Sequence, residues 1–207
     1  MFIRKALLAL ATLAFFAAGP AAAQDPQTFG TLQPPQPTEG GGKVEVVEFF
    51  WYGCPHCYAL EPSVNAWIKS APKDVVFKRV PAMSNASWTE AGKIYYTLEG
   101  MGLLEQYHQK VFDAMHKDNI NLANKRLRDE WLAKNGIDPA KYNDMEKSFS
   151  VASKVSRAQQ MTAAYKVDSV PRIAVNGKYY TSAEQAGGAA GVFPVVDQLV
   201  ARARKDK

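Results

Sequence analysis

A run of β-branched and aromatic residues, 43–52, stops just before the motif CPHC at 54–57, which holds the only two cysteines among 207 residues. The run has the composition of a buried strand. Residues 54–71 have the pattern of a helix, in which Pro55 is tolerated because it lies in the first turn. Residues 74–80 indicate a second strand. This order favours two parallel strands joined by a right-handed crossover, with the cysteines where the helix begins.

Residues 87–165 differ from this first unit, because helical periodicity runs through almost all of them. Breaks fall at Gly100, Gly136 and Pro139, residues that commonly end or begin helices. We expect four or five helices, forming an insertion in the chain.

A short strand is expected again at 172–175. It is followed by Asn176-Gly177, the strongest short signal for a β-hairpin, and by a return strand at 178–181. A C-terminal helix is expected over 192–204. The predicted order is therefore β-α-β, a helical block, then β-β-α, which is an α/β fold.

The N-terminus has the pattern of a secretory signal peptide, predicted to span residues 1–23. Arg4 and Lys5 precede an apolar run at 6–18, and three alanines close the segment. An uncleaved membrane anchor is disfavoured because the apolar run is too short to span a bilayer. We therefore expect a protein folded outside the cytoplasm, where disulfides persist.

Residues 24–42 are rich in Pro, Gly and Gln and predict an extended lead-in, within which 29–32 is a candidate short edge strand. The charge balance excludes one class of function. The chain has 25 basic and 20 acidic residues, a mild excess without the basic stripe that marks a nucleic-acid-binding protein.

Three interpretations compete for the cysteine pair. A structural disulfide is disfavoured, because a bridge across two intervening residues closes almost no loop in the unfolded chain. A zinc site needs four ligands, and His108 and His116 are eight residues apart on predicted helices, so we interpret them as ordinary helix residues. The third interpretation is a reactive redox pair.

A redox pair at this position has definite chemistry. The N-terminus of a helix presents free N–H groups, which stabilise a thiolate and lower the pKa of Cys54. His56 can donate a hydrogen bond to that thiolate or place a positive charge beside it. We expect Cys54 to be the more exposed sulfur and Cys57, one turn further, the buried one. Stabilising the thiolate stabilises the reduced pair, so its disulfide is an oxidant.

The segments EFFWYGCPHC at 48–57 and SVPRIAVNGKYY at 169–180 resemble the DsbA-type periplasmic thiol:disulfide oxidoreductases. The resemblance covers nearly all of the chain that follows the expected signal peptide. It implies a thioredoxin-like domain made of residues 43–86 and 166–207, with an inserted all-helical domain at 87–165.

The same resemblance implies roles for individual residues. Cys54 corresponds to the substrate-facing cysteine and Cys57 to its buried partner, while Pro55 and His56 correspond to the dipeptide that sets the redox poise. Pro171 corresponds to a cis-proline that lies against the pair. Together with Val170, it would offer backbone hydrogen bonds to a bound substrate strand.

An acidic residue below the active site is also implied, and here it is Glu48. A carboxyl in a buried strand is costly unless it is paired or protonated, so we expect it to relay a proton to or from the buried cysteine. Its basic partner is expected to be Lys78 or Arg79, with the register left open. We interpret Glu45, on the same strand, as facing outward.

The function implied is oxidation of cysteine pairs in newly exported proteins by donation of the disulfide. The resemblance further implies a periplasmic monomer, reoxidation by a DsbB-type membrane quinone reductase, and no cofactor or metal besides the redox-active disulfide. Two alternatives remain: a disulfide isomerase or reductase, and a non-enzymatic secreted binding module. The latter predicts an ordinary pKa for Cys54 and no effect of His56→Ala.

Overall fold

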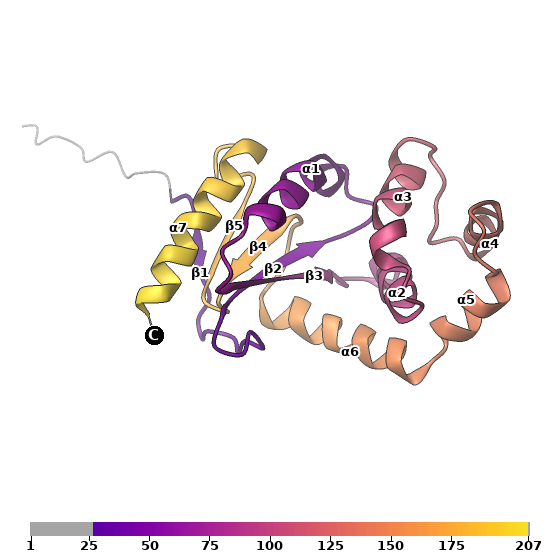
Figure 1. The fold of residues 1–207 in the computed structure, drawn as a ribbon, viewed down its shortest axis with the longest axis horizontal. Helices are drawn as coiled ribbons and strands as arrows, with labels where there is room; N and C mark the ends of the chain where they lie inside the picture. The colour runs from indigo at the N-terminus through magenta and orange to yellow at the C-terminus, as the bar shows by residue number, and fades with distance from the viewer. Residues whose placement is uncertain (1–26, 207) are drawn as a thin grey trace, which may run out of the picture.

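The computed structural model describes residues 27–206, so the predicted signal peptide lies outside the described residues. One mixed sheet forms the centre of the molecule (Figure 1). Its strands, in spatial order, are β1 (Gly30–Thr31), β5 (Tyr179–Ser182), β4 (Arg172–Val175), β2 (Val44–Phe50) and β3 (Val75–Pro81). Strands β2 and β3 are parallel, while β4 is antiparallel to both of its neighbours. The expected parallel crossover, edge strand and hairpin are all confirmed.

The helices follow the predicted order. They are α1 (Pro55–Ser70), α2 (Ala86–Gly100), α3 (Leu104–His116), α4 (Lys125–Lys134), α5 (Pro139–Glu146), α6 (Phe149–Ala164), the 3₁₀ turn η1 (Ala189–Gly191) and α7 (Val192–Lys205). Helices α2 to α5 gather at one end of the sheet, and α6 runs back beneath it (Figure 1). Within residues 27–206, no helix combines the length and apolar character needed to cross a membrane.

Local capping explains where the inserted helices begin. Asn85, Asn124, Asp138 and Ser148 each accept a hydrogen bond from a backbone N–H in the first turn of α2, α4, α5 and α6 respectively. Such side chains satisfy donors that the helix itself leaves unpaired. Of the breaks expected from the sequence, Pro139 begins α5, Gly100 ends α2 and Gly136 follows the end of α4.

Strand β2 is buried on both faces, which decides where the active cysteines lie. Val44 and Val46 pack with α1 and α7 in one apolar cluster. Val47 and Phe49 point to the other face, where Phe49 contacts the Tyr165 ring, 5.0 Å away between centroids. Because β2 is enclosed in this way and ends shortly before α1, it fixes the position at which α1 begins.

The expectation that Glu45 faces outward is wrong. Only 2% of Glu45 is exposed, and its carboxylate lies 2.7 Å from the ammonium group of Lys78. It also accepts a hydrogen bond from the backbone N–H of Glu39, in the lead-in segment. The reason is that the lead-in and α6 cover this face of β2 beside Glu45.

Two glycines with a left-handed backbone differ in whether the lead-in packs against them. Gly177 (φ +66°) lies in the hairpin turn, where an added Cβ would be 2.0 Å from the Gln36 carbonyl oxygen, whereas Gly187 (φ +73°) has open space around it. We expect Gly187→Ala to cost roughly 1–2 kcal/mol from backbone strain alone. Gly177→Ala should cost on the order of 3 kcal/mol, because the lead-in must also shift. Urea unfolding of both variants measures the difference; equal losses would contradict the close packing.

Candidate active site

Cys54 is the N-cap of α1. Its sulfur accepts a hydrogen bond from the backbone N–H of Cys57 at 3.3 Å, and its own N–H donates to the Trp51 carbonyl at 2.9 Å. The helix therefore begins one residue later than the sequence pattern indicates. Cys54 is 6% exposed and Cys57 is 0% exposed. Cys54 is the more accessible of the two, as expected, although even its residue surface is mostly covered.

The two sulfurs have opposite electrostatic surroundings. A hydrogen bond from the Cys57 thiol, backbone N–H groups of Cys57 and His56, and the charge of His56 together outweigh burial and lower the pKa of Cys54 to about 6. Burial, followed by the hydrogen bond and charge of Cys54, raises the pKa of Cys57 far above its ordinary value. Near neutral pH the reduced pair thus holds one thiolate and one thiol.

The loop before β4 lies directly against the cysteine pair. The Cys54 sulfur lies 3.4 Å from the Val170 carbonyl oxygen, across 116 positions of sequence, and donates a hydrogen bond to it only when it is a thiol. The bond between Val170 and Pro171 is cis, which agrees with what the resemblance implies. The geometry therefore brings together Cys54, Cys57, Val170 and Pro171, all of which were predicted as site residues.

The register of the parallel strands identifies the partner of Glu48. Arg79 on β3 is opposite Glu48 on β2, and the Arg79 Nε atom lies 3.2 Å from a carboxylate oxygen of Glu48. Lys78 points to the other face and pairs with Glu45. Burial, with a smaller contribution from the charge of Glu61, raises the pKa of Glu48 to about 8, and Arg79 only partly opposes this. Glu48 is therefore largely protonated at neutral pH.

Sequence reasoning missed three side chains that extend this buried cluster. Glu61 on α1 is 0% exposed and lies 3.1 Å from the Arg79 guanidinium. His108 on α3 lies 3.3 Å from the other Glu61 oxygen, and its Nδ1 atom is 2.7 Å from the Tyr52 hydroxyl. A continuous polar chain thus runs from Glu48 to Tyr52 inside the apolar core.

One of these residues carried a usable signal. Glu61 follows Cys57 by four positions, and residues four apart on a helix share a face. A carboxyl on the face of the buried cysteine could therefore have been anticipated. His108 could not, because its contact depends on how the inserted α3 packs on α1, and no local pattern encodes that packing.

Aromatic rings border the cysteine loop. Trp51 stacks on Trp88 of α2 with centroids 4.9 Å apart, and an added Cβ on Gly53 would lie 2.3 Å from the Trp51 ring. On the other side, His116 stacks on Tyr58 and hydrogen-bonds the Tyr52 carbonyl at 2.8 Å. Residues of the inserted helices thus hold the active-site loop from both sides.

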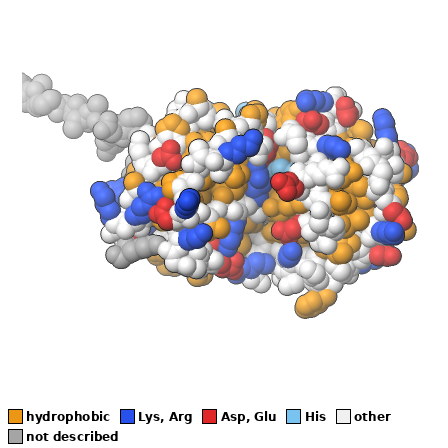
Figure 2. Space-filling model, viewed as in Figure 1, with side chains coloured by type: hydrophobic (Ala, Val, Ile, Leu, Met, Phe, Trp, Pro, Cys, Tyr) orange, Lys and Arg blue, Asp and Glu red, His pale blue; other side chains and the backbone are white. Residues whose placement is uncertain are grey.

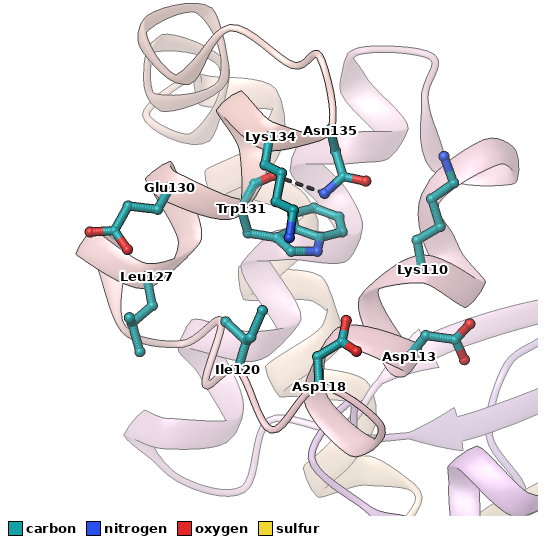
Figure 3. Close-up of a pocket in the computed structure, with 9 residues that line it drawn as sticks. All are labelled: Lys110, Asp113, Asp118, Ile120, Leu127, Glu130, Trp131, Lys134 and Asn135. Carbon is teal, nitrogen blue, oxygen red and sulfur yellow. Dashed lines mark hydrogen bonds between the residues drawn. The ribbon is translucent and has the colours of Figure 1, made fainter.

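No group of three or more His, Cys, Asp or Glu side chains in residues 27–206 is placed to hold a metal ion. A hollow of about 430 Å³ lies away from the cysteines, between α3 and α4 (Figure 3). It is lined by Lys110, Asp113, Asp118, Ile120, Leu127, Glu130, Trp131, Lys134 and Asn135. Its three carboxylates and two ammonium groups nearly balance, so it favours no strongly charged ligand.

Comparison with known proteins gives independent evidence for the family of this chain. A family model described as a DSBA-like thioredoxin domain matches residues 71–200. The thiol:disulfide interchange protein DsbA of Bordetella parapertussis is 44% identical over 202 residues, which is 97% of this chain and 95% of the relative. The protein of the same name from Pseudomonas aeruginosa PAO1 is 39% identical over 206 residues, or 98% of this chain and 96% of its own.

Solved structures agree with the sequence relatives. The crystal structure of Pseudomonas aeruginosa DsbA superposes with a TM-score of 0.82 at 38% identity, covering 87% of this chain and 94% of that one. The oxidoreductase DsbA from Xylella fastidiosa gives a TM-score of 0.78 at 26% identity, covering 86% of this chain and 95% of that one.

The first prediction from this site concerns the thiolate. In the reduced protein, ultraviolet absorbance of the thiolate should appear in a transition with a midpoint near pH 6, the pKa of Cys54. Cys57→Ala should move the midpoint upward more than His56→Ala does, because the hydrogen bond from Cys57 contributes most to the lowered pKa. A midpoint near the ordinary thiol value of about 8.5 would contradict the site described here.

The second prediction concerns Glu48 in the oxidised protein, where neither sulfur titrates. Because its pKa is raised to about 8, the native state holds a proton that the unfolded chain has already lost. Stability is then fully present below pH about 4.5 and falls as pH rises toward 8, by up to about 1.4 kcal/mol per pH unit.

Glu48→Gln should flatten this slope when urea unfolding is measured across the same pH range. Glu130→Gln, which removes a carboxyl with 59% of its side chain exposed, serves as the matched control and should leave the slope in place. An unchanged slope in Glu48→Gln would show that Glu48 is not the group responsible.

Proposed function

The chain belongs to the DsbA-like family of thiol:disulfide oxidoreductases, and we propose that it donates its Cys54–Cys57 disulfide to reduced, newly exported polypeptides. The observation that carries the proposal is the contrast between the two sulfurs. One is stabilised as a thiolate at a helix N-terminus, and the other is buried and favours the thiol.

The reaction takes two exchange steps. A substrate thiolate attacks the Cys54 sulfur, which breaks the bond to Cys57 and forms a mixed disulfide. The departing Cys57 thiolate takes up a proton, because burial disfavours its charge. A second substrate thiolate then attacks the substrate sulfur of the mixed disulfide, and Cys54 leaves as a thiolate. Two electrons pass from the substrate to the enzyme, and the substrate gains a disulfide.

The direction of transfer follows from the leaving group. A thiolate with a pKa near 6 leaves readily, and its stability lowers the free energy of the reduced enzyme. Both effects favour oxidation of the substrate over its reduction. A reductase of the thioredoxin kind has a reactive cysteine with a pKa near 7, so the lower pKa of Cys54 favours the oxidase over that alternative.

Other predicted residues receive supporting roles in the proposal. Glu48, largely protonated at neutral pH, is the internal acid for the Cys57 thiolate and becomes its base when the enzyme is reoxidised. Val170 and Pro171 bind the substrate backbone beside the reacting sulfur, which the contact of 3.4 Å between Cys54 and the Val170 carbonyl supports. Pro55 and His56 set how strongly the thiolate is stabilised.

The proposal includes a location and partners. We place the protein in the periplasm, with the segment 1–23 as its signal peptide and a DsbB-type quinone reductase as its reoxidant. We propose that it acts as a monomer, as the family resemblance implies. Charges of both signs are interspersed over the face in Figure 2, which fits a polypeptide substrate and gives no support for a nucleic-acid partner.

The test is the redox potential against glutathione. We expect the Cys54–Cys57 couple to be clearly more oxidising than thioredoxin, whose potential is about −270 mV. Stoichiometric oxidation of a reduced two-cysteine peptide should follow. Cys54→Ser should abolish the transfer, whereas Cys57→Ser should accumulate a mixed disulfide with the disulfide-linked dimer of a single-cysteine peptide, because neither the enzyme nor the bound peptide then holds a second thiol to resolve it.

Two results would redirect the assignment. A potential at or below that of thioredoxin, with rapid reshuffling of a scrambled disulfide substrate, would favour an isomerase or reductase. Absence of any mixed disulfide in Cys57→Ser would favour the non-enzymatic binding module.

A further inference from the structure

Glu48 and Glu61 are both 0% exposed, and the guanidinium of Arg79 faces both of them, at 3.2 Å from one and 3.1 Å from the other. A single positive charge offsets one buried carboxylate but not two. Near neutral pH the pair therefore retains one proton, and the two carboxyls compete for it.

The hydrogen bonds around the two carboxyls are unequal. Glu61 accepts from Arg79 Nη2 at 3.1 Å, from Asn65 Nδ2 at 3.2 Å, and contacts His108 Nε2 at 3.3 Å. Glu48 has only Arg79 Nε, at 3.2 Å, as a donor among the described residues, and its oxygens find no further partner there. Donors stabilise the ionised form, so the proton is held by the carboxyl that has fewer of them.

The tautomer of His108 follows from its two partners. Its Nδ1 atom lies 2.7 Å from the Tyr52 hydroxyl, and its Nε2 atom faces Glu61. A proton on Nδ1 would require a protonated Glu61 to donate to Nε2, although Arg79 pairs with that carboxylate. The consistent arrangement has the Tyr52 hydroxyl donating to Nδ1 and the Nε2–H donating to Glu61. Burial lowers the pKa of His108, which keeps the imidazole neutral.

From this geometry we infer that His108, oriented by Tyr52, holds the carboxylate of Glu61 ionised, so that the shared proton stays on Glu48. His108 and Tyr52 are thus positioning residues, acting on the reaction only through the carboxyl pair. The inference rests on the proposed function, because it identifies what keeps Glu48 ready to protonate the Cys57 thiolate.

Solvent access to the cluster comes from the side of α3. His108 and Arg79 line a cavity of about 720 Å³ between α1, β3, α2 and α3, whereas Glu48 is wholly enclosed. A proton lost from Glu48 can thus be replaced from this cavity by way of His108 and Glu61, while Arg79 stays charged. The titratable and charged groups facing Glu48 are Arg79 on β3, Glu61 and Cys57 on α1, and Tyr95 on α2. Those facing His108 are Tyr52, Glu61, Arg79 and the Tyr95 ring of α2.

The experiment follows the carboxyl carbons directly. Oxidised protein with ¹³C-labelled glutamate is titrated from about pH 4 to about pH 10, a range that brackets ordinary and raised carboxyl pKa values. Glu48→Gln and Glu61→Gln assign the two signals. In the unsubstituted protein the signal of Glu48 should titrate above neutral pH and that of Glu61 well below it.

His108→Leu should bring the two midpoints closer together, raising that of Glu61 and lowering that of Glu48 by about one unit or more, the effect of losing a hydrogen bond to a charged group. His108→Gln, which keeps a donor, should restore the original separation. Tyr52→Phe should shift both midpoints in the same directions but by less, because the Nε2–H remains while the hydroxyl that orients the ring is lost. If His108→Leu folds poorly, Tyr52→Phe combined with His108→Leu removes both partners and carries the same expectation.

Unchanged midpoints in the His108→Leu protein, or a proton on Glu61 before any substitution, would overturn the inference. Neither result depends on turnover, so a failure here is separate from a failure of the proposed oxidase activity. Where that activity holds, disulfide donation by His108→Leu should decline with rising pH at a lower pH than in the unsubstituted protein.

Discussion

The molecule depends on keeping the Cys54 sulfur more stable as a thiolate than as a thiol. The N-terminus of α1 makes this possible, because backbone N–H groups without helical partners point at the sulfur there. Holding a helix end in that position requires a rigid support immediately before it. Strand β2, paired on both edges and buried on both faces, is that support.

The same enclosure of β2 forces carboxyl groups into the core, where a negative charge is costly. A strand covered on both faces has no solvated side, so Glu45 and Glu48 are both buried. Their environments differ, because Glu45 lies 2.7 Å from Lys78, whereas Glu48 shares Arg79 with Glu61. Two acids on one strand thus reach different states, one paired with its own cation and the other holding a proton near the buried sulfur.

The parts of this design that are local in sequence could be predicted, and those that depend on packing could not. The junction of strand and helix at Cys54, and the Asn176-Gly177 turn, are each encoded in a few adjacent residues. The choice of Arg79 over Lys78 required the register of two strands, and the burial of Glu45 required knowing what covers the sheet. His108 was interpreted as an ordinary helix residue, because nothing near it in the chain points to Tyr52 and Glu61.

The proposed reaction favours an internal proton donor because the two sulfurs make opposite demands. Cys54 leaves the substrate as a stable anion and needs no proton, whereas Cys57 is 0% exposed and is a poor anion. Because protein covers Cys57, the proposal takes its proton from a group on the protein side of α1. A carboxyl there is useful only if it is still protonated near neutral pH, which an exposed glutamate is not. Burial of Glu48 beside an already paired Glu61 supplies that state.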